Sequence, residues 1–150
     1  MTSALARLRV PADLQRLAEV RQLVRETTRA AGASQDCVDD VCQAVDEAAT
    51  NTIIHGYAGA PGWVEVAVAV DGPDVVVTLE DDAPPFDPRT RAEPDMSVSA
   101  LVRGPHGMGV HLMRLATDTL DWRPRDGGGN ILTLVRTLAQ RPQEDSPDGA

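Results

Sequence analysis

Residues 45–57, with the sequence Val-Asp-Glu-Ala-Ala-Thr-Asn-Thr-Ile-Ile-His-Gly-Tyr, have the residue spacing of an amphipathic helix. At ~100° per residue, Glu47, Asn51 and His55 lie on one stripe of such a helix. The residues expected on the opposite side are small or aliphatic and suit packing: Val38, Val41, Val45, Ala49 and Thr52. The pattern predicts a helix that packs with one face and presents a carboxylate and a carboxamide on the other.

Size and charge limit the classes of function that this chain can have. A chain of 150 residues fits one domain with its own core, which we expect to span residues 1–140, with a disordered polar tail at 141–150. The net charge of -9 argues against a nucleic-acid partner, because such binding depends on Lys and Arg that neutralise phosphates. All 14 basic residues are arginine, which excludes a P-loop lysine and Schiff-base chemistry.

The sequence predicts a soluble, cytoplasmic protein without a membrane partner. Its first residues lack a basic region followed by an apolar run of signal-peptide length. The longest apolar stretch, residues 64–70, is too short to span a bilayer. Cys37 and Cys42 point about 140° apart on a helix, so they suit neither a redox pair nor a shared metal face.

The sequence also predicts an opening strand, two long helices and two strand pairs. Residues 5–10 alternate weakly as a strand, and a helix is expected from residue 11 to residue 32, with Leu14, Leu17, Val20 and Val24 on its apolar stripe. Ser34 suits the N-cap of the second helix, which should end at Gly56. The predicted strands cover residues 5–10, 63–70, 75–81, 119–122 and 131–138.

Two further stretches place polar groups or glycines at element ends. One predicted strand ends at Asp81 and is followed by Ala83-Pro84-Pro85-Phe86-Asp87-Pro88. Residues 83–104 then form a connection long enough to suggest a lid. Gly104-Pro105-His106-Gly107-Met108-Gly109 opens a helix continued by Val110, and the free N–H groups of a helix start favour a phosphate.

Each of these features also has an ordinary structural explanation. Glu47 and Asn51 fit a solvated helix face, Asp81 fits a turn, and residues 83–104 fit a disordered loop. The glycines follow a GxxGxG spacing, which is not the dinucleotide fingerprint. His106 and His111 lie five residues apart, which makes them a poor zinc pair. The order and combination of the features decide between these explanations.

In that order and combination, residues 5–140 resemble the GHKL ATPase superfamily, the ATP-binding fold shared by type II topoisomerases, MutL and histidine kinases. Within it, the chain is similar to the stand-alone anti-sigma-factor serine/threonine kinases. The resemblance implies an α+β fold: a two-layer sandwich of a mixed, mostly antiparallel sheet with helices on one face. It also implies ATP and Mg²⁺ as cofactors.

Carried over to this sequence, the resemblance makes Glu47 the general base and Asn51 the ligand of Mg²⁺. Asp81 would accept a hydrogen bond from the adenine amino group. The full set of implied nucleotide-binding residues is Asn51, Asp81, Ala83, Phe86, Arg103, Gly104, His106, Gly107, Met108, Gly109 and Val110. The chain departs from the family pattern where Ala83 replaces the usual glycine and where Asn130 stands in place of a threonine found in many relatives.

The resemblance implies a kinase that sequesters a sigma factor and phosphorylates a STAS-domain anti-anti-sigma factor, and it implies a homodimer. One alternative is a non-catalytic module of the same fold that binds ATP and docks a partner. Another is the catalytic half of a histidine kinase, but the short segment before Ser34 does not supply a phosphoacceptor hairpin.

Overall fold

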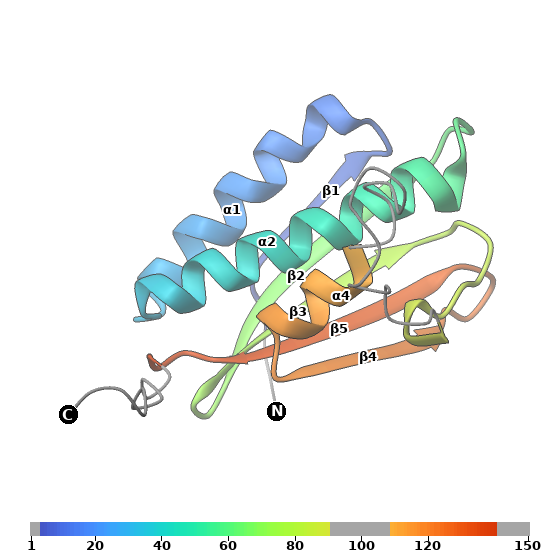
Figure 1. Ribbon diagram of the computed structural model, residues 1–150. Helices are drawn as coiled ribbons and strands as arrows, with labels where there is room; N and C mark the ends of the chain where they lie inside the picture. The colour runs from blue at the N-terminus through green and yellow to red at the C-terminus, as the bar shows by residue number, and fades with distance from the viewer. Residues whose placement is uncertain (1–3, 91–108, 141–150) are drawn as a thin grey trace, which may run out of the picture.

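A five-stranded sheet forms one layer of the computed structural model, which describes residues 4–90 and 109–140 (Figure 1). The strand order is β1-β2-β3-β5-β4, and every adjacent pair of these described strands is antiparallel. The strands are β1 (Ala4–Pro11), β2 (Trp63–Asp71), β3 (Asp74–Asp81), β4 (Thr119–Pro124) and β5 (Asn130–Thr137).

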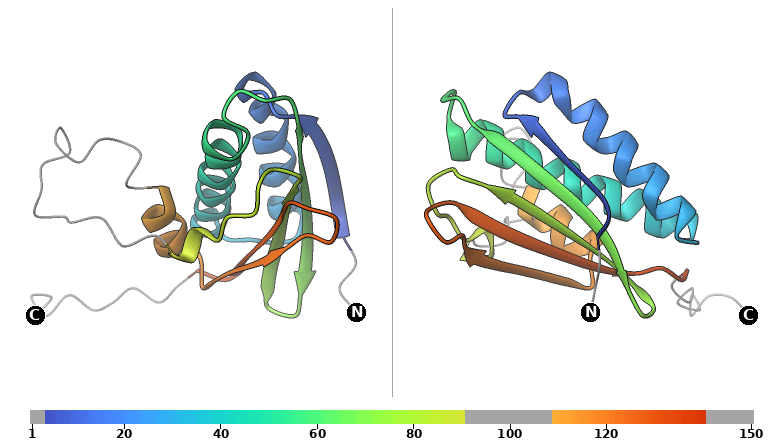
Figure 2. Two further views of the ribbon diagram at one scale, coloured as in Figure 1. Left: turned by 90° about the vertical axis from the view of Figure 1, so that its right-hand side faces the viewer. Right: turned by 180° about the vertical axis from the view of Figure 1, so that it is seen from behind.

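Within the described residues, three α-helices cover one face of this sheet. They are α1 (Leu17–Ala30), α2 (Gln35–Asn51) and α4 (Gly109–Ala116). Viewed from behind, the strands lie in front and the helices lie beyond them (Figure 2). The α+β fold predicted from the sequence is confirmed. The lid expected at residues 83–104 lies outside the described residues from residue 91 onward, as does the tail at residues 141–150.

The strand alternation decides which residues face the helices. In β3, Val75, Val77 and Leu79 are buried against the helices, while the residues between them are half-buried. Because successive side chains of a strand point to opposite faces, Asp81 points to the same side as these three residues. The last residue of β3 therefore places a carboxylate under the helix layer, where it is 4% exposed.

The two long helices begin differently, because α2 starts with a side-chain cap and α1 does not. Ser34 Oγ accepts a hydrogen bond from the Cys37 backbone N–H, as predicted for the start of α2. The predicted start of the first helix is wrong, because Asp13 caps a short 3-10 turn, η1 (Leu14–Arg16), and α1 begins only at Leu17. Leu14 is consequently 47% exposed and does not belong to the apolar stripe.

The end of α2 also differs from the prediction. The α-helix ends at Asn51 and continues as one π-helical segment, η2 (Thr52–Tyr57), so the chain stays helical past Gly56. Ala58, with a φ of 51°, is the left-handed residue that terminates it. A π-turn closes i→i+5 hydrogen bonds, so its side chains are spaced differently from those of an α-helix. The change of spacing begins at Thr52, beside Asn51.

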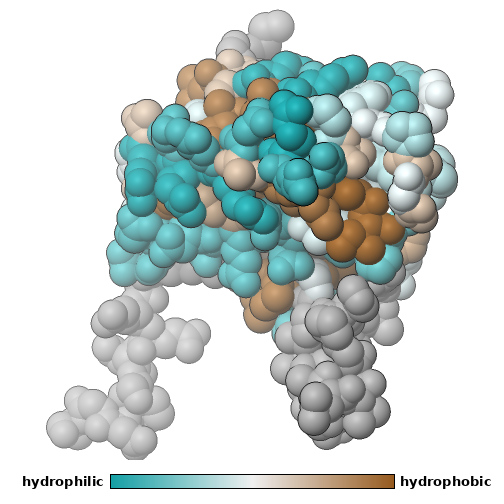
Figure 3. Space-filling view, turned by 90° about the horizontal axis from the view of Figure 1, so that it is seen from above, coloured by the Kyte–Doolittle hydropathy of each residue, from teal (hydrophilic) through white to brown (hydrophobic). Residues whose placement is uncertain are grey.

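Seen from above, the surface of the molecule is mostly hydrophilic, with a smaller hydrophobic area (Figure 3). On the helix layer, Arg21 of α1 pairs with Asp46 of α2 at 2.6 Å. None of the helices in the described part of the chain is long and apolar enough to cross a membrane.

Candidate functional site

A cavity of about 390 Å³ opens between the C-terminal part of α2 and the strands β3, β5 and β4. This volume lies within the range of small-molecule sites, roughly 300–1,000 Å³. Its walls are mainly apolar, and few polar side chains reach it. The lining residues are Ala48, Asn51, Thr52, His55, Gly56, Leu79, Asp81, Ala83, Pro84, Pro85, Phe86, Pro88, Val110, Met113, Trp122, Asn130 and Leu132.

Asp81 is the buried acid of the cavity. Its Oδ1 accepts hydrogen bonds from Asn130 Nδ2 at 2.8 Å and from the Ala83 backbone N–H at 3.0 Å. Thr52 Oγ1 lies 3.5 Å from Oδ2, at the limit of a hydrogen bond. Burial raises the pKa of Asp81, and the hydrogen bonds from Asn130 and Ala83 oppose that rise. The carboxylate thus has one oxygen held by two strong donors and one oxygen that lacks a comparable donor among the described residues.

Asn130 is the residue that connects Asp81 to the rest of the wall. The antiparallel register pairs Asp81 directly with Asn130. Asn130 Oδ1 accepts hydrogen bonds from the Phe86 backbone N–H at 2.8 Å and from Trp122 Nε1 at 2.9 Å. One amide therefore joins β3, β4, β5 and the segment after β3.

The glycine before Asn130 allows this close approach. Gly129 has a φ of +118°, and a Cβ placed on it would lie 2.0 Å from the Asp81 carbonyl oxygen. Both the backbone conformation and the lack of space require glycine. The β4–β5 turn can therefore approach the end of β3 only because residue 129 has no side chain.

Ala83, which departs from the family pattern, fits the cavity wall tightly. It is 1% exposed, and its Cβ lies 3.2 Å from the position that a Cβ on Gly56 would take. The methyl group of Ala83 therefore occupies space left by Gly56 on η2.

Glu47 and Asn51 lie at the other end of the site, against the start of α4. A Cβ on Gly109 would lie 3.0 Å from Asn51 Nδ2 and 3.2 Å from Glu47 Oε2. The first residue of α4 therefore brings its backbone close to both side chains. Within residues 4–90 and 109–140, the side chains of Glu47 and Asn51 make no hydrogen bond or ion pair. None of these described residues therefore competes with a ligand for their polar atoms.

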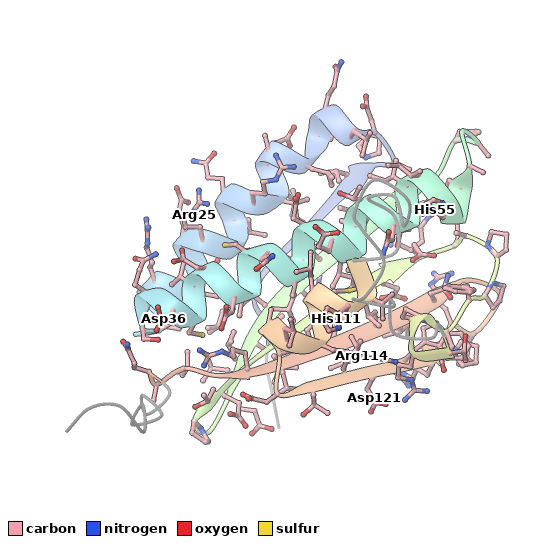
Figure 4. All side chains as sticks on the ribbon, in the orientation of Figure 1. Arg25, Asp36, His55, His111, Arg114 and Asp121 are labelled. Carbon is pink, nitrogen blue, oxygen red and sulfur yellow. The ribbon has the colours of Figure 1, made fainter. Side chains whose placement is uncertain are left out.

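The segment after β3 is anchored by charges. Arg89, in the 3-10 turn η3 (Pro88–Thr90), donates to Asp87 and, at 2.8 Å, to Asp121 of β4. Arg114 of α4 donates to the Arg89 carbonyl at 2.7 Å. Figure 4 shows Arg114 and Asp121 on the neighbouring elements α4 and β4, with His55 at the far end of the α2–η2 helix. These contacts fix the wall that Phe86 and Pro88 contribute.

The structure brings most of the described sequence-predicted residues together. Asn51, Asp81, Ala83, Phe86 and Val110 line the cavity, and Glu47 and Gly109 meet beside Asn51. The remaining predicted residues lie outside the described residues: Arg103, Gly104, His106, Gly107 and Met108.

Several residues of the wall were not predicted from the sequence, and three of them belong to the hydrogen bonds around Asp81 and Asn130. Thr52 was expected on the packing face, but it lines the cavity near Asp81. Trp122 was assigned only to a strand, and Asn130 was noted only as a departure from the family. The register of β3 on β5, which pairs Asp81 with Asn130, is the signal that identifies Asn130.

The donor set fits a nucleotide and a hard metal ion. Among the described residues, no three His, Cys, Asp or Glu side chains converge on one point. Mg²⁺ needs only one or two protein oxygens beside phosphates and water, and Asn51 offers one. The aliphatic, proline and aromatic walls suit the flat faces of a nucleobase, and Asp81 offers a buried acceptor for its edge.

Comparison with known proteins gave consistent matches. The family model of the histidine kinase-like ATPase domain matches residues 10–136. The anti-sigma F factor of Clostridium kluyveri is 29% identical over 103 residues, covering 69% of this chain and 72% of that protein. The anti-sigma F factor of Thermoanaerobacter sp. (strain X514) is 25% identical over 101 residues, covering 67% of this chain and 71% of that protein.

One solved structure supports the same fold. The crystal structure of the RsbU and RsbW domains of a Mycobacterium tuberculosis protein matches with a TM-score of 0.58 and 20% sequence identity. The match covers 94% of this chain and 35% of that longer chain.

Proposed function

Because this chain belongs to the histidine kinase-like ATPase domain family, we propose that it binds ATP with Mg²⁺ in the cavity between α2 and the sheet. We further propose that it is a serine/threonine kinase that sequesters a sigma factor and phosphorylates a STAS-domain anti-anti-sigma factor. The relatives named anti-sigma F factor support this regulatory role. The proposed assembly is a homodimer in the cytoplasm.

The observation that carries the proposal is the arrangement of polar groups at two ends of one apolar cavity. Asp81 is buried at one end with Oδ2 available to an amino donor. Glu47 and Asn51 meet the start of α4 at the other end. An adenine nucleotide needs this combination: an acceptor for its base, apolar walls, and a helix start beside a metal ligand for its phosphates.

The described residues divide the work of phosphotransfer. Asp81 would orient the base, and Asn51 would hold Mg²⁺ through its carbonyl oxygen, where the ion would supply charge neutralisation for the phosphates. The N-terminus of α4, which begins at Gly109, favours the phosphate charge. Glu47 accepts the proton of the incoming serine hydroxyl, whose oxygen bonds to the γ-phosphorus as the bond to ADP breaks.

A phosphotransfer assay tests this proposal. Purified protein is incubated with γ-labelled ATP, Mg²⁺ and a candidate STAS-domain protein, and label transfer is followed for wild type, Glu47→Gln and Asn51→Ala. Glu47→Gln should bind ATP but lose transfer by ~100-fold or more, since it lacks the general base. Asn51→Ala should lose magnesium-dependent ATP binding.

Two results would count against this proposal. Tight ATP binding without transfer to any STAS protein, and partner binding that does not respond to Glu47→Gln, would favour a non-catalytic docking module. Variants that bind and react like wild type would remove Glu47 and Asn51 from the site.

A further inference from the structure

The hydrogen bonds around Asn130 fix which way its amide group points. The Phe86 backbone N–H and the Trp122 indole N–H can only donate. Both contact the same side-chain atom of Asn130, at 2.8 Å and 2.9 Å, so that atom is the carbonyl oxygen. The amino group of Asn130 must then face Asp81, at 2.8 Å.

The hydrogen bonds around Asp81 fix which of its two oxygens accepts from the protein. Its Oδ1 meets two donors, Asn130 Nδ2 and the Ala83 backbone N–H, and therefore serves as an acceptor for both. Oδ2, whose neighbour among the described residues is Thr52 Oγ1 at 3.5 Å, is the oxygen available to a ligand. The hydroxyl of Thr52 has a better acceptor in the Ala48 carbonyl at 3.1 Å.

We propose that Asn130 is a positioning residue that fixes which oxygen of Asp81 presents a hydrogen-bond acceptor to the cavity, and that it thereby sets how strongly the site prefers a purine with an amino group at carbon 6. Trp122 and Phe86, whose N–H groups can only donate, fix the orientation of the Asn130 amide. The amino group of Asn130 then occupies Asp81 Oδ1, which leaves Oδ2 as the acceptor for the ligand. This inference rests on the nucleotide binding proposed above and adds a basis for the choice of base.

Because Asp81 Oδ2 is an acceptor, the site should prefer a base that presents a donor to it. The 6-amino group of ATP donates a hydrogen bond to Asp81 Oδ2. ITP has an oxo group at that carbon, which places an acceptor against the carboxylate. A buried acceptor without a donor costs ~1–3 kcal/mol, so wild type should prefer ATP over ITP by about tenfold or more.

Asp81→Asn gives the sharpest test, because it keeps the shape of the side chain. The oxygen of Asn at position 81 must accept from Asn130 and Ala83, so its NH₂ group takes the place of Oδ2 and donates into the cavity. The variant should therefore prefer ITP over ATP. Calorimetric titration of the full chain with Mg²⁺-ATP and with Mg²⁺-ITP gives the ratio of dissociation constants.

Asn130→Thr and Asn130→Val form a matched pair for the positioning role. They have nearly the same shape and differ by a hydroxyl group that can donate to Asp81. The threonine variant should keep most of the ATP preference, and the valine variant should reduce it to about threefold or less, because a missing donor is the only difference between them. A purely packing role for residue 130 would affect the two variants equally.

The outcomes separate this inference from the proposed function. Wild-type protein that binds neither nucleotide overturns the proposed function and this inference with it. Wild-type protein that binds ATP, together with Asp81→Asn that still prefers ATP, overturns the inference alone. Equal ATP preference in Asn130→Thr and Asn130→Val also overturns it. Trp122 fluorescence in a Trp63→Phe background reports whether the wall around residue 130 stays intact in each variant.

Discussion

The paired strands β3 and β5 carry a polar side chain under the helix layer at each of their ends, and the two ends are used differently. At one end, Asp81 pairs in register with Asn130, and at the other, Val75 pairs with Arg136. Arg136 is 1% exposed, and its guanidinium donates to Asp40 of α2 at 3.1 Å and to the carbonyls of Thr137 and Ala139.

The difference lies in where the partners are. The Arg136 guanidinium is surrounded by acceptors from the protein, so it ties α2 to the last strand. Asp81 is buried to a similar degree, but one of its oxygens borders the cavity instead of a strong donor. A buried polar group whose partners are all supplied by the fold stabilises the structure, whereas one with an atom left for a ligand forms a site. The following changes test this distinction.

The largest effect on stability is expected for Asp40→Ala. It leaves the Arg136 guanidinium buried without its carboxylate, which should lower the free energy of unfolding by about 3 kcal/mol in urea titrations. Asp39→Ala, an exposed neighbour on the same helix, should change it by less than about 0.5 kcal/mol. ATP affinity should be unchanged in both. Equal stability of the two variants would show that the Arg136 end is not structural.

A somewhat smaller effect is expected at the turn that closes the cavity. Gly129→Ala places a methyl group 2.0 Å from the Asp81 carbonyl oxygen, whereas Gly128→Ala, with a φ of +108°, meets nothing within 4 Å. Both variants place alanine at a positive φ, which costs about 1–3 kcal/mol, and only Gly129→Ala adds a collision. We expect Gly129→Ala to unfold at the lower temperature and to lose nucleotide binding. Identical melting temperatures would contradict the close approach.

Tyr57→Phe removes a polar contact that lies beside the cavity but does not line it. The Tyr57 hydroxyl contacts Asp82 Oδ1 at 2.6 Å and the Trp63 carbonyl at 2.7 Å, and burial is the main reason that its pKa rises to about 12. Its loss should lower the free energy of unfolding by ~1–2 kcal/mol while the preference for ATP over ITP stays. A changed preference would assign Tyr57 to the site.

The smallest effect concerns the pH dependence contributed by Asp81. Its folded-state pKa is raised by burial, so its ionisation disfavours the folded state at neutral pH. As the pH falls from that raised value to the ordinary value of ~3.9, wild type should gain stability relative to Asp81→Asn, which has no such titration. Urea titrations of both proteins between pH 7 and pH 4 measure the difference. An opposite slope would show that hydrogen bonds outweigh burial at Asp81.

Local periodicity allowed most helices and strands and part of the site to be predicted, whereas the two-layer arrangement was implied by the family resemblance. Alternation in residues 75–81 places Asp81 on the buried face, and helical spacing places Glu47 and Asn51 together. The position of Thr52 could not be predicted, because the change from α to π hydrogen bonding after Asn51 leaves no periodic signal. The role of Asn130 depends on a register between strands distant in the sequence.

Calorimetric titration of purified protein with ATP, with and without Mg²⁺, tests most directly whether the cavity beside Asp81 binds ATP with Mg²⁺. We predict magnesium-dependent binding by wild type and by Asp39→Ala, and a loss of ATP affinity of about tenfold or more in Asp81→Asn. Absence of ATP binding by wild type, or equal affinity of wild type and Asp81→Asn, would contradict the account.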